Sequence, residues 1–290
     1  MSAGPPRVAL VIGSGSVKCA AAIGIRSVLE RAGIGLDMLV GCSGGAIYAA
    51  AMATGRSAGE IAAMARALWT RDVTGQRDNA GMMRAIAPKL MKFDAERFGL
   101  RDDRLIMKRL RAAFGEARVE DMRVPLHLTA TDFANGELVT LSRGPVVDAI
   151  RASIALPFAF APRRIDGRLL VDGFLADPMP VSVAIKQGAD VIVAVGFESP
   201  YQDTVRSASR FAFQLSSIMS NNLLKSRLAF HGMAHHGEVI VVVPEFRERV
   251  RLFETEKLDY VIAEGERAMT AHLPYLRELL GLGAAGAPAR

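Results

Sequence analysis

The sequence predicts an α/β protein with a mainly parallel central sheet. Apolar runs of strand length alternate with helix-length patterns along most of the chain, which is typical of that fold class. Two of these runs, 191–195 and 239–243, consist mostly of β-branched residues, as strands buried on both faces do. Half of the 290 residues are hydrophobic and 23% are charged, so the chain can bury a sizeable core.

Strands and helices alternate in the first third of the chain. The apolar run 8–12 predicts a strand, and an alanine-rich helix follows it after a turn. A second strand is expected at 36–40 and a helix of small residues at 44–52. Ser57 and Glu60 have the spacing of a capping box, so a further helix should begin immediately after Ser57.

Two hairpins are expected in the middle of the chain, because strand patterns flank Asn135-Gly136 and Asp166-Gly167. Longer apolar patterns of helical period follow toward the C-terminus. The expected strands cover 126–130, 137–141, 163–165 and 168–171, and the expected long helices cover 204–230 and 257–280.

The chain is predicted to form one domain over residues 1–290, since no internal repeat and no Pro/Ser-rich linker divides it. The core is expected over about 7–280, with a mostly helical insertion at about 71–123. Residues 281–290 are expected to form a flexible tail.

Most of the net charge of +6 falls within that insertion. Residues 71–123 contain 13 Lys and Arg against 9 Asp and Glu, a net charge of +4. A solvated helical face explains such an excess, and an anionic phospholipid surface is the alternative partner. Nucleic acid is not expected, because no interleaved aromatic residues accompany the charges.

The sequence favours an intracellular protein. Its first seven residues lack the apolar core of a secretory signal, and no apolar run is long enough to cross a bilayer. Cys19 and Cys42 are the two cysteines, too few for a disulfide framework or a four-ligand zinc site. We therefore expect a cytoplasmic location, with peripheral membrane contact as an open alternative.

A glycine-bearing turn, GSGSVKC at 13–19, separates the first expected strand from the first helix. Such a turn usually holds a negative charge at a helix N-terminus. The Gly-Lys-Ser/Thr ending of a P-loop is missing, and a dinucleotide fingerprint would need glycine where Lys18 stands. The turn is therefore interpreted as a set of backbone N–H groups directed at a reaction centre.

The pentapeptide GCSGG at 41–45 matches the nucleophile-elbow pattern G-x-S-x-G. It follows an expected strand and precedes an expected helix, where the chain turns so sharply that only small residues fit beside the serine. Ser43 is thus the candidate nucleophile. The alternative is a glycine-rich turn in which Ser43 only caps the helix.

A serine nucleophile needs a base that takes its proton. None of the five histidines stands in a short loop after a late strand, where the base of a Ser-His-Asp hydrolase belongs: His127, His231, His235, His236 and His272. Asp172 is the better candidate, because it ends an expected strand, where the sites of α/β proteins collect. Burial would raise the low pKa of this aspartate and make a Ser43–Asp172 pair chemically workable.

Taken together, the turn, the elbow and the aspartate resemble the patatin-like phospholipase family, its bacterial cytoplasmic members in particular. That family has a glycine-rich turn ending in a basic residue, then a G-x-S-x-G elbow, then a D-G-[GA] aspartate well downstream. Here GSGSVK at 13–18, GCSGG at 41–45 and DG at 172–173 follow in the same order. The likeness covers roughly 7–200, and 71–123 matches least.

The resemblance implies a three-layer α/β/α fold and hydrolysis of acyl esters, mostly of lipids, as by a phospholipase A, a lysophospholipase or an esterase. It implies a dyad without histidine, metal or cofactor, in which Ser43 attacks and Asp172 accepts the proton. The tetrahedral oxyanion would be bound by N–H groups among Gly13, Ser14, Gly15 and Gly44. The positions that would support the turns are Lys18, Gly41, Gly45 and Gly173.

Three residues depart from the family pattern. Ser14 and Cys19 stand where the family usually has glycine, and Phe174 replaces the small third residue of D-G-[GA]. A positive φ at Ser14 or Cys19 would cost about 1–2 kcal/mol per residue. Phe174 would either narrow the pocket or pack outward. The alternatives to a Ser/Asp enzyme are therefore a non-catalytic lipid-binding or regulatory protein of the same fold, and a Ser-His-Asp hydrolase.

The segment 204–230 combines hydrophobic residues with cations, a pattern that suits a helix lying on an anionic bilayer. A helix packed on the sheet, or against another subunit, is the alternative. No feature of the sequence selects an oligomeric state. The cations of this segment are Arg206, Arg210, Lys225 and Arg227.

Overall fold

The computed structural model describes residues 4–70, 94–198, 201, 204–206, 208–234, 238–251 and 254–283. Its eight strands form one sheet. Seven of them follow the order β5-β6-β3-β2-β1-β7-β8, and β4 pairs with β3 on the edge opposite β2 and β6. The strands are β1 Val8–Ile12, β2 Met38–Cys42, β3 Leu126–Asp132, β4 Leu138–Leu141, β5 Arg163–Ile165, β6 Arg168–Asp172, β7 Val191–Val195 and β8 Glu238–Val242.

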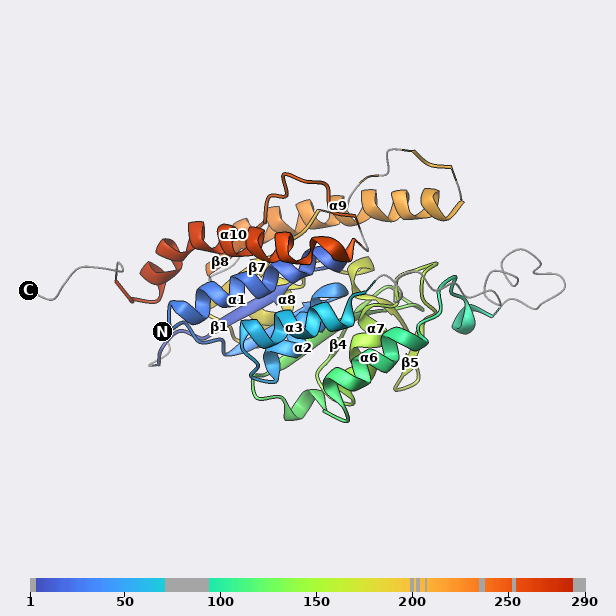
Figure 1. Ribbon diagram of the computed structural model, residues 1–290, viewed down its shortest axis with the longest axis horizontal. Coiled ribbons are helices and arrows are strands. Elements are labelled where there is room, and N and C mark those ends of the chain that lie inside the picture. Colours follow the sequence, from blue (N-terminus) through green and yellow to red (C-terminus); the bar gives the residue numbers. More distant parts are fainter. Residues whose placement is uncertain are drawn as a thin grey trace, which may run out of the picture.

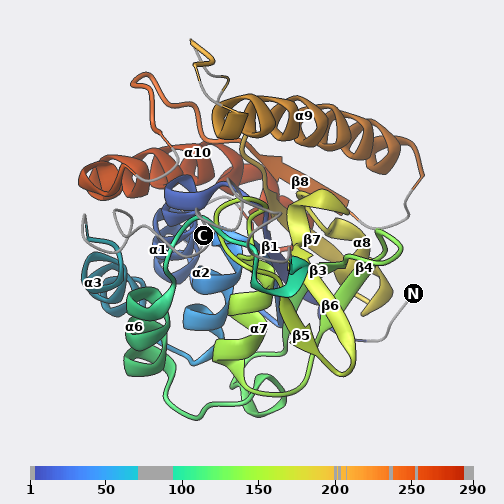
Figure 2. The ribbon, with the colours of Figure 1, turned by 90° about the vertical axis from the view of Figure 1, so that its right-hand side faces the viewer.

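The sheet is mixed but mostly parallel. The strands β3, β2, β1, β7 and β8 run parallel to one another, while β4, β5 and β6 join as antiparallel neighbours. Helices cover it on both faces (Figures 1 and 2). They are α1 Ala21–Arg31, α2 Gly44–Ala53, α3 Ala58–Leu68, α6 Arg104–Phe114, α7 Val146–Ser153, α8 Val181–Lys186, α9 Ala208–Ala234 and α10 Leu258–Leu279.

Successive strand residues point to opposite faces, so each central strand contributes to two cores. Leu10 and Ile12 of β1 belong to the larger core, beneath α1, α2 and α10. Ala9 and Val11 belong to the smaller one, beneath α8 and Leu224 of α9. The expected α/β class and its three α/β/α layers are thereby confirmed (Figure 2).

Two glycines let α1 and α10 lie in close contact. A Cβ atom on Gly24 would lie 2.0 Å from the carbonyl oxygen of Ile262, and one on Gly265 would lie 1.9 Å from that of Ala21. Because real Cβ atoms do not approach so closely, the two helix backbones can meet only at glycine. Their contact fixes the helix that follows the glycine turn of the candidate site.

Most expected elements are found. Ser57 caps α3 through a full capping box with Glu60, and both expected hairpins form. The second strand is 38–42 rather than the expected 36–40. Just before it, the Asp37 N–H donates to the Val8 carbonyl, and the Asp37 carboxylate accepts from the Val8 N–H. The two long helices expected at 204–230 and 257–280 are α9 at 208–234 and α10 at 258–279.

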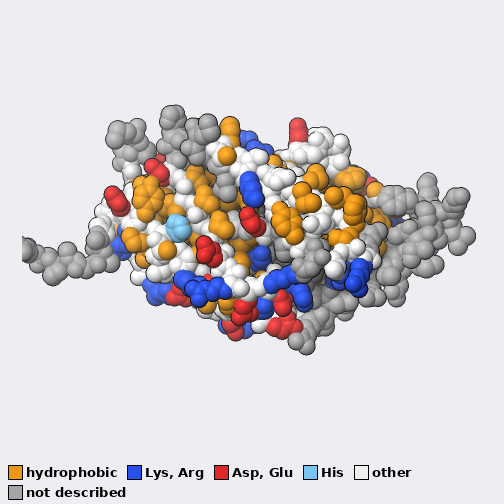
Figure 3. All heavy atoms as spheres, turned by 90° about the horizontal axis from the view of Figure 1, so that it is seen from above, with side chains coloured by type: hydrophobic (Ala, Val, Ile, Leu, Met, Phe, Trp, Pro, Cys, Tyr) orange, Lys and Arg blue, Asp and Glu red, His pale blue; other side chains and the backbone are white. Residues whose placement is uncertain are grey.

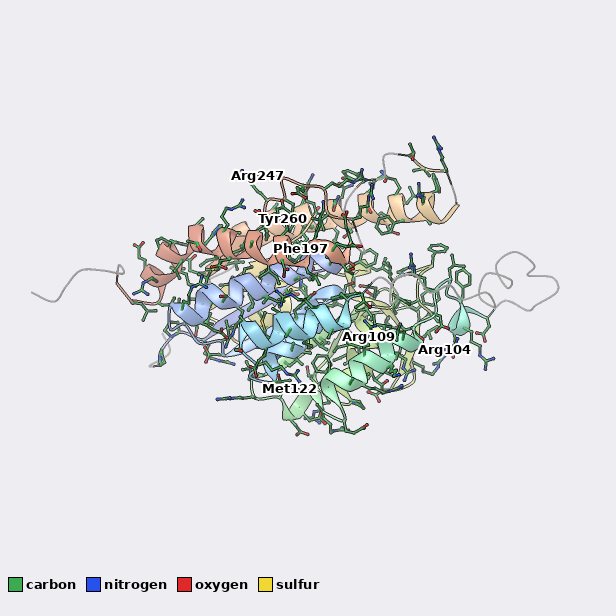
Figure 4. All side chains as sticks on the ribbon, viewed as in Figure 1. Arg104, Arg109, Met122, Phe197, Arg247 and Tyr260 are labelled. Carbon is green, nitrogen blue, oxygen red and sulfur yellow. The ribbon has the colours of Figure 1, made fainter. Side chains whose placement is uncertain are left out.

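The expected helical insertion is described in part. Residues 71–93 lie outside the described residues, as do 284–290 of the expected tail. Beyond the first of these gaps, α6 packs beside α3, and Arg109 donates hydrogen bonds to the carbonyl oxygens of Ala67 and Leu68 at the end of α3 (Figure 4). That contact holds Trp69, the residue after α3, next to the site.

Candidate active site

The candidate site lies where two strands meet end to end on one edge of β3. Cys42, the last residue of β2, pairs with Thr129, and Asp172, the last residue of β6, pairs with the next residue of β3, Ala130. β4 occupies the opposite edge of β3, so β2 and β6 share this one. The residue after β2, Ser43, therefore reaches Asp172 across 129 sequence positions.

Ser43 occupies a sharp turn between β2 and α2. Its φ of 54° and ψ of −126° are rare for a residue with a side chain, as a nucleophile elbow requires. A Cβ atom on Gly41 would lie 2.7 Å from Ala46 Cα, and one on Gly45 would lie 2.3 Å from the Ile12 carbonyl oxygen. The glycines thus let the turn lie against both β1 and its own helix.

The Ser43 hydroxyl donates a 2.7 Å hydrogen bond from Oγ to Oδ2 of Asp172. The Phe174 N–H donates to Oδ1 of the same carboxylate at 3.1 Å. Asp172 is 1% exposed, and this burial raises its pKa from 3.8 to about 7, although the bonds from Ser43 and Phe174 oppose the rise. A carboxylate with such a pKa can take and return a proton near neutral pH.

Neither cysteine is in a state that suits a nucleophile. Cys42, beside Ser43, and Cys19 are both fully buried. Burial raises the pKa of both thiols well above its ordinary value, and the nearby Asp172 carboxylate adds to the rise. Both thiols therefore stay protonated, and a protonated thiol is a poor nucleophile.

The two histidines whose side chains are described contact other residues than Ser43. His127 Nδ1 lies 2.8 Å from Ser142 Oγ, and His272 Nδ1 lies 2.9 Å from the Ala268 carbonyl oxygen. The side chains of the remaining three, at 231, 235 and 236, lie outside the described part of the chain. In the described part, the ionisable side chain hydrogen-bonded to the Ser43 hydroxyl is that of Asp172.

The glycine turn follows β1 and runs beside the elbow. The Gly13 N–H donates to the Val195 carbonyl at 2.9 Å, and the Ser14 N–H donates to the Pro178 carbonyl at 2.8 Å. Both groups therefore hold the turn in place. Gly44 begins α2, whose first N–H groups have no partner within the helix.

The same turn continues through Gly15 to Ser16. In the part of the chain that the structure describes, no protein acceptor is bonded to the Gly15 N–H. Gly15 and Gly44 both line the pocket together with Ser43. A Cβ atom on Gly44 would lie 2.8 Å from Ser16 Cα, so turn and elbow approach each other backbone to backbone.

The departures at Ser14 and Cys19 introduce no positive φ. Within 13–19, the non-glycine residue with a positive φ is Ser16, at 51°. The Cys19 thiol donates to the Gly13 carbonyl at 3.3 Å, which adds a contact that glycine could not make. The turn thus accommodates Ser14 and Cys19 without the positive-φ strain considered from the sequence.

Lys18 and Gly173 support neighbouring segments. Lys18 Nζ donates to the Glu198 carbonyl at 3.0 Å and lies 5.4 Å from the centre of the Phe246 ring. Its burial lowers its pKa. A Cβ atom on Gly173 would lie 2.6 Å from the Thr129 carbonyl oxygen, so Gly173 lets the chain leave Asp172 close to β3.

The pocket in front of Ser43 is mostly apolar. Phe174 is 8% exposed and lines it, so this residue narrows the pocket rather than packing outward. Three residues of α9 close one side: Phe213, Ser216 and Ser217. The other apolar lining residues are Trp69, Ile106, Ile154, Leu156 and Phe160.

Ser153 is a site residue that the motifs did not single out. Its Oγ accepts a 2.8 Å hydrogen bond from the Ser43 N–H, from the end of α7. This bond helps to hold the elbow in its strained conformation. The only signal was its position within residues 7–200, the span of the resemblance, and no motif there marks it.

Comparison with known proteins shows the family of the chain. The sequence model of the patatin-like phospholipases matches residues 10–185, a span that includes the turn, the elbow and Asp172. The chain belongs to the patatin-like phospholipase family. An uncharacterised NTE family protein of Mycobacterium tuberculosis is 33% identical over 203 residues, which are 70% of this chain and 52% of that protein. The patatin-like chain thus spans about half the length of the first curated relatives it matches.

The more distant matches of this patatin-like chain are larger proteins. The rat patatin-like phospholipase domain-containing protein 7 is 28% identical over 190 residues, 65% of this chain and 13% of that protein. Among solved structures, VipD from Legionella pneumophila is similar with a TM-score of 0.48 at 15% identity, covering 94% of this chain and 67% of VipD. The type III effector protein ExoU gives 0.49 at 16% identity, covering 95% and 54%.

Proposed function

We propose that this chain hydrolyses acyl esters of lipids, with Ser43 as the nucleophile and Asp172 as the general base. The observation that carries the proposal is the 2.7 Å hydrogen bond from the Ser43 hydroxyl to a buried carboxylate at an apolar pocket. Membership of a phospholipase family supports a lipid ester as the substrate class.

The first half of the reaction acylates the serine. Asp172 takes the hydroxyl proton as Ser43 Oγ attacks the ester carbonyl carbon, and the carbonyl π electrons move onto oxygen. The N–H groups of Gly15 and Gly44 bind this oxyanion. Each such hydrogen bond stabilises the transition state by on the order of 3 kcal/mol. The intermediate then collapses, the C–O bond to the alcohol breaks, and Asp172 returns its proton to the leaving oxygen.

The second half releases the acid. Asp172 takes a proton from water, the hydroxide attacks the acyl-Ser43 carbonyl, and the same N–H groups bind the second oxyanion. Collapse of this intermediate breaks the bond to Oγ, which recovers its proton from Asp172. The apolar walls of the pocket suit the hydrocarbon chain of the acyl group.

Ester turnover by single-residue variants tests the proposal. With p-nitrophenyl esters of increasing chain length, we expect Ser43→Ala to lose at least about a thousandfold in kcat/KM. The control is Ser27→Ala, which removes a hydroxyl bonded to Arg31 on the surface of α1. Wild-type turnover in Ser43→Ala would refute the dyad. Vesicle binding by a wild-type chain that cleaves no ester of the panel would instead favour a non-catalytic lipid-binding protein.

A further inference from the structure

The helix α9 has a reversed distribution of polar and apolar residues. A helix that covers a sheet normally turns its apolar side inward. In α9 the inward positions include Ser217, Ser220 and Asn221, which are 2%, 5% and 2% exposed. The Ser217 hydroxyl has no hydrogen-bond partner among the described residues. The inward side of this helix is therefore unusually polar.

The outward side of the same helix carries large hydrophobic residues. Phe211, Leu215, Ile218 and Met219 lie on one face because each residue turns the helix by about 100°. They are 57%, 46%, 38% and 70% exposed, and they are called the α9 patch below. Figure 3 looks onto α9 and α10 and shows hydrophobic side chains gathered on this surface. Water is a poor solvent for a continuous apolar patch, which indicates a partner.

The α9 patch lies directly behind the pocket. The opposite side of the same stretch of α9 lines the pocket with Ser43, through Phe213, Ser216 and Ser217. The 3-10 turn Gly173–Leu175, which follows Asp172, packs against α9 and exposes Leu175. Whatever covers the patch therefore lies about one helix diameter, 10 Å, from the wall of the pocket that α9 forms.

Charge selects the partner. The 27 residues of α9 include no Asp or Glu, and two exposed cations, Arg206 and Arg210, stand at its N-terminal end. Lys225 and Arg227, farther along the helix, pair with Glu198 and Asp177. An apolar face with exposed cations at one end matches the surface of an anionic bilayer, with its acyl chains beneath phosphate groups. A second copy of the chain would instead place two cationic helices face to face.

We propose that the α9 patch docks on anionic phospholipid bilayers and so presents the pocket to lipid esters at the membrane surface. The helix lies on the surface rather than crossing it, because no helix among the described residues is long and apolar enough to span a bilayer. Only the identity of the substrate rests on the proposed function, since docking is a binding event that needs no turnover.

Vesicle sedimentation with the full chain tests the docking. The test variant is Leu215→Ser with Met219→Ser, two exposed positions outside the pocket lining. The control is Leu282→Ser, which is also 46% exposed but follows α10. We expect the wild type and the control to bind phosphatidylglycerol vesicles more tightly than phosphatidylcholine vesicles. The double variant should bind at least about tenfold more weakly.

Hydrolysis separates docking from catalysis. The double variant should keep wild-type turnover of a short, soluble p-nitrophenyl ester, which also shows that it is folded, and lose turnover of vesicle lipid in proportion to its lost binding. Ser43→Ala should still bind vesicles. Undiminished binding by the double variant, or equal binding to neutral and anionic vesicles, would overturn the proposal. So would a wild-type dimer in sedimentation equilibrium that the double variant converts to monomer.

Discussion

The buried carboxylate of Asp172 should destabilise the fold at neutral pH, and Asp172→Asn should relieve this cost. The asparagine amide can still accept from the Phe174 N–H through its oxygen and donate to Ser43 Oγ through its nitrogen, so both existing contacts have a replacement. What disappears is the cost of ionising a group that is 1% exposed.

The magnitude follows from the pKa. Burial raises the pKa of Asp172 from 3.8 to about 7. Each pKa unit corresponds to about 1.4 kcal/mol, so the full difference corresponds to about 4 kcal/mol. Well below pH 3.8 the group is protonated in both the folded and the unfolded chain, and it costs nothing. Between pH 4 and 7 the unfolded chain releases this proton first, so the wild type loses stability as the pH rises.

Urea unfolding at pH 4, 6 and 8 measures this effect. Trp69, the only tryptophan, is buried and donates to the Tyr48 hydroxyl, so its fluorescence reports the fold. We expect Asp172→Asn to exceed the free energy of unfolding of the wild type by less than about 1 kcal/mol at pH 4 and by up to about 4 kcal/mol at pH 8. The control is Asp121→Asn, at an exposed position. Equal stability of Asp172→Asn and the wild type at pH 8 would refute the reasoning.

Three further predictions concern rate, packing and specificity. Because Asp172 must be ionised to act as a base, kcat/KM should rise about tenfold per pH unit below 7 and level off above it; a flat profile from pH 5 to 8 would contradict this. Gly265→Ala should cost about 3 kcal/mol in urea unfolding, whereas Gly59→Ala, with open space around its Cβ position in α3, should gain up to about 1 kcal/mol. Phe174→Ala should shift the kcat/KM optimum toward longer acyl chains. An unchanged chain-length profile would mean that the acyl group does not bind against Phe174.

The elements predicted well from the sequence are those that local patterns determine. The elbow at 41–45 combines a strand ending with three glycines, and the hairpin at Asp166-Gly167 combines two residues that both adopt a positive φ. Ser57 and Glu60 specify the start of α3 within a single turn. Each of these signals acts over a few residues, so the sequence alone was sufficient.

The sequence could not supply contacts that depend on distant register. The pairing of Asp172 with Ala130 places the carboxylate at Ser43, and no local pattern fixes that register. The N–H groups of Gly13 and Ser14 donate to carbonyl groups more than 160 residues away, which leaves Gly15 and Gly44 as the proposed oxyanion donors. The motif named all four positions because a motif records residue types and not hydrogen-bond partners.

Covalent labelling tests the central claim most directly. A fluorophosphonate reacts with a serine only when a neighbouring group takes its proton, so it reports the Ser43–Asp172 pair without requiring the physiological substrate. Mass spectrometry of digested protein should find the adduct on Ser43 in the wild type, none in Ser43→Ala, and labelling at least about a hundredfold slower in Asp172→Asn. An adduct on another residue, or wild-type labelling of Ser43 in Asp172→Asn, would contradict the account.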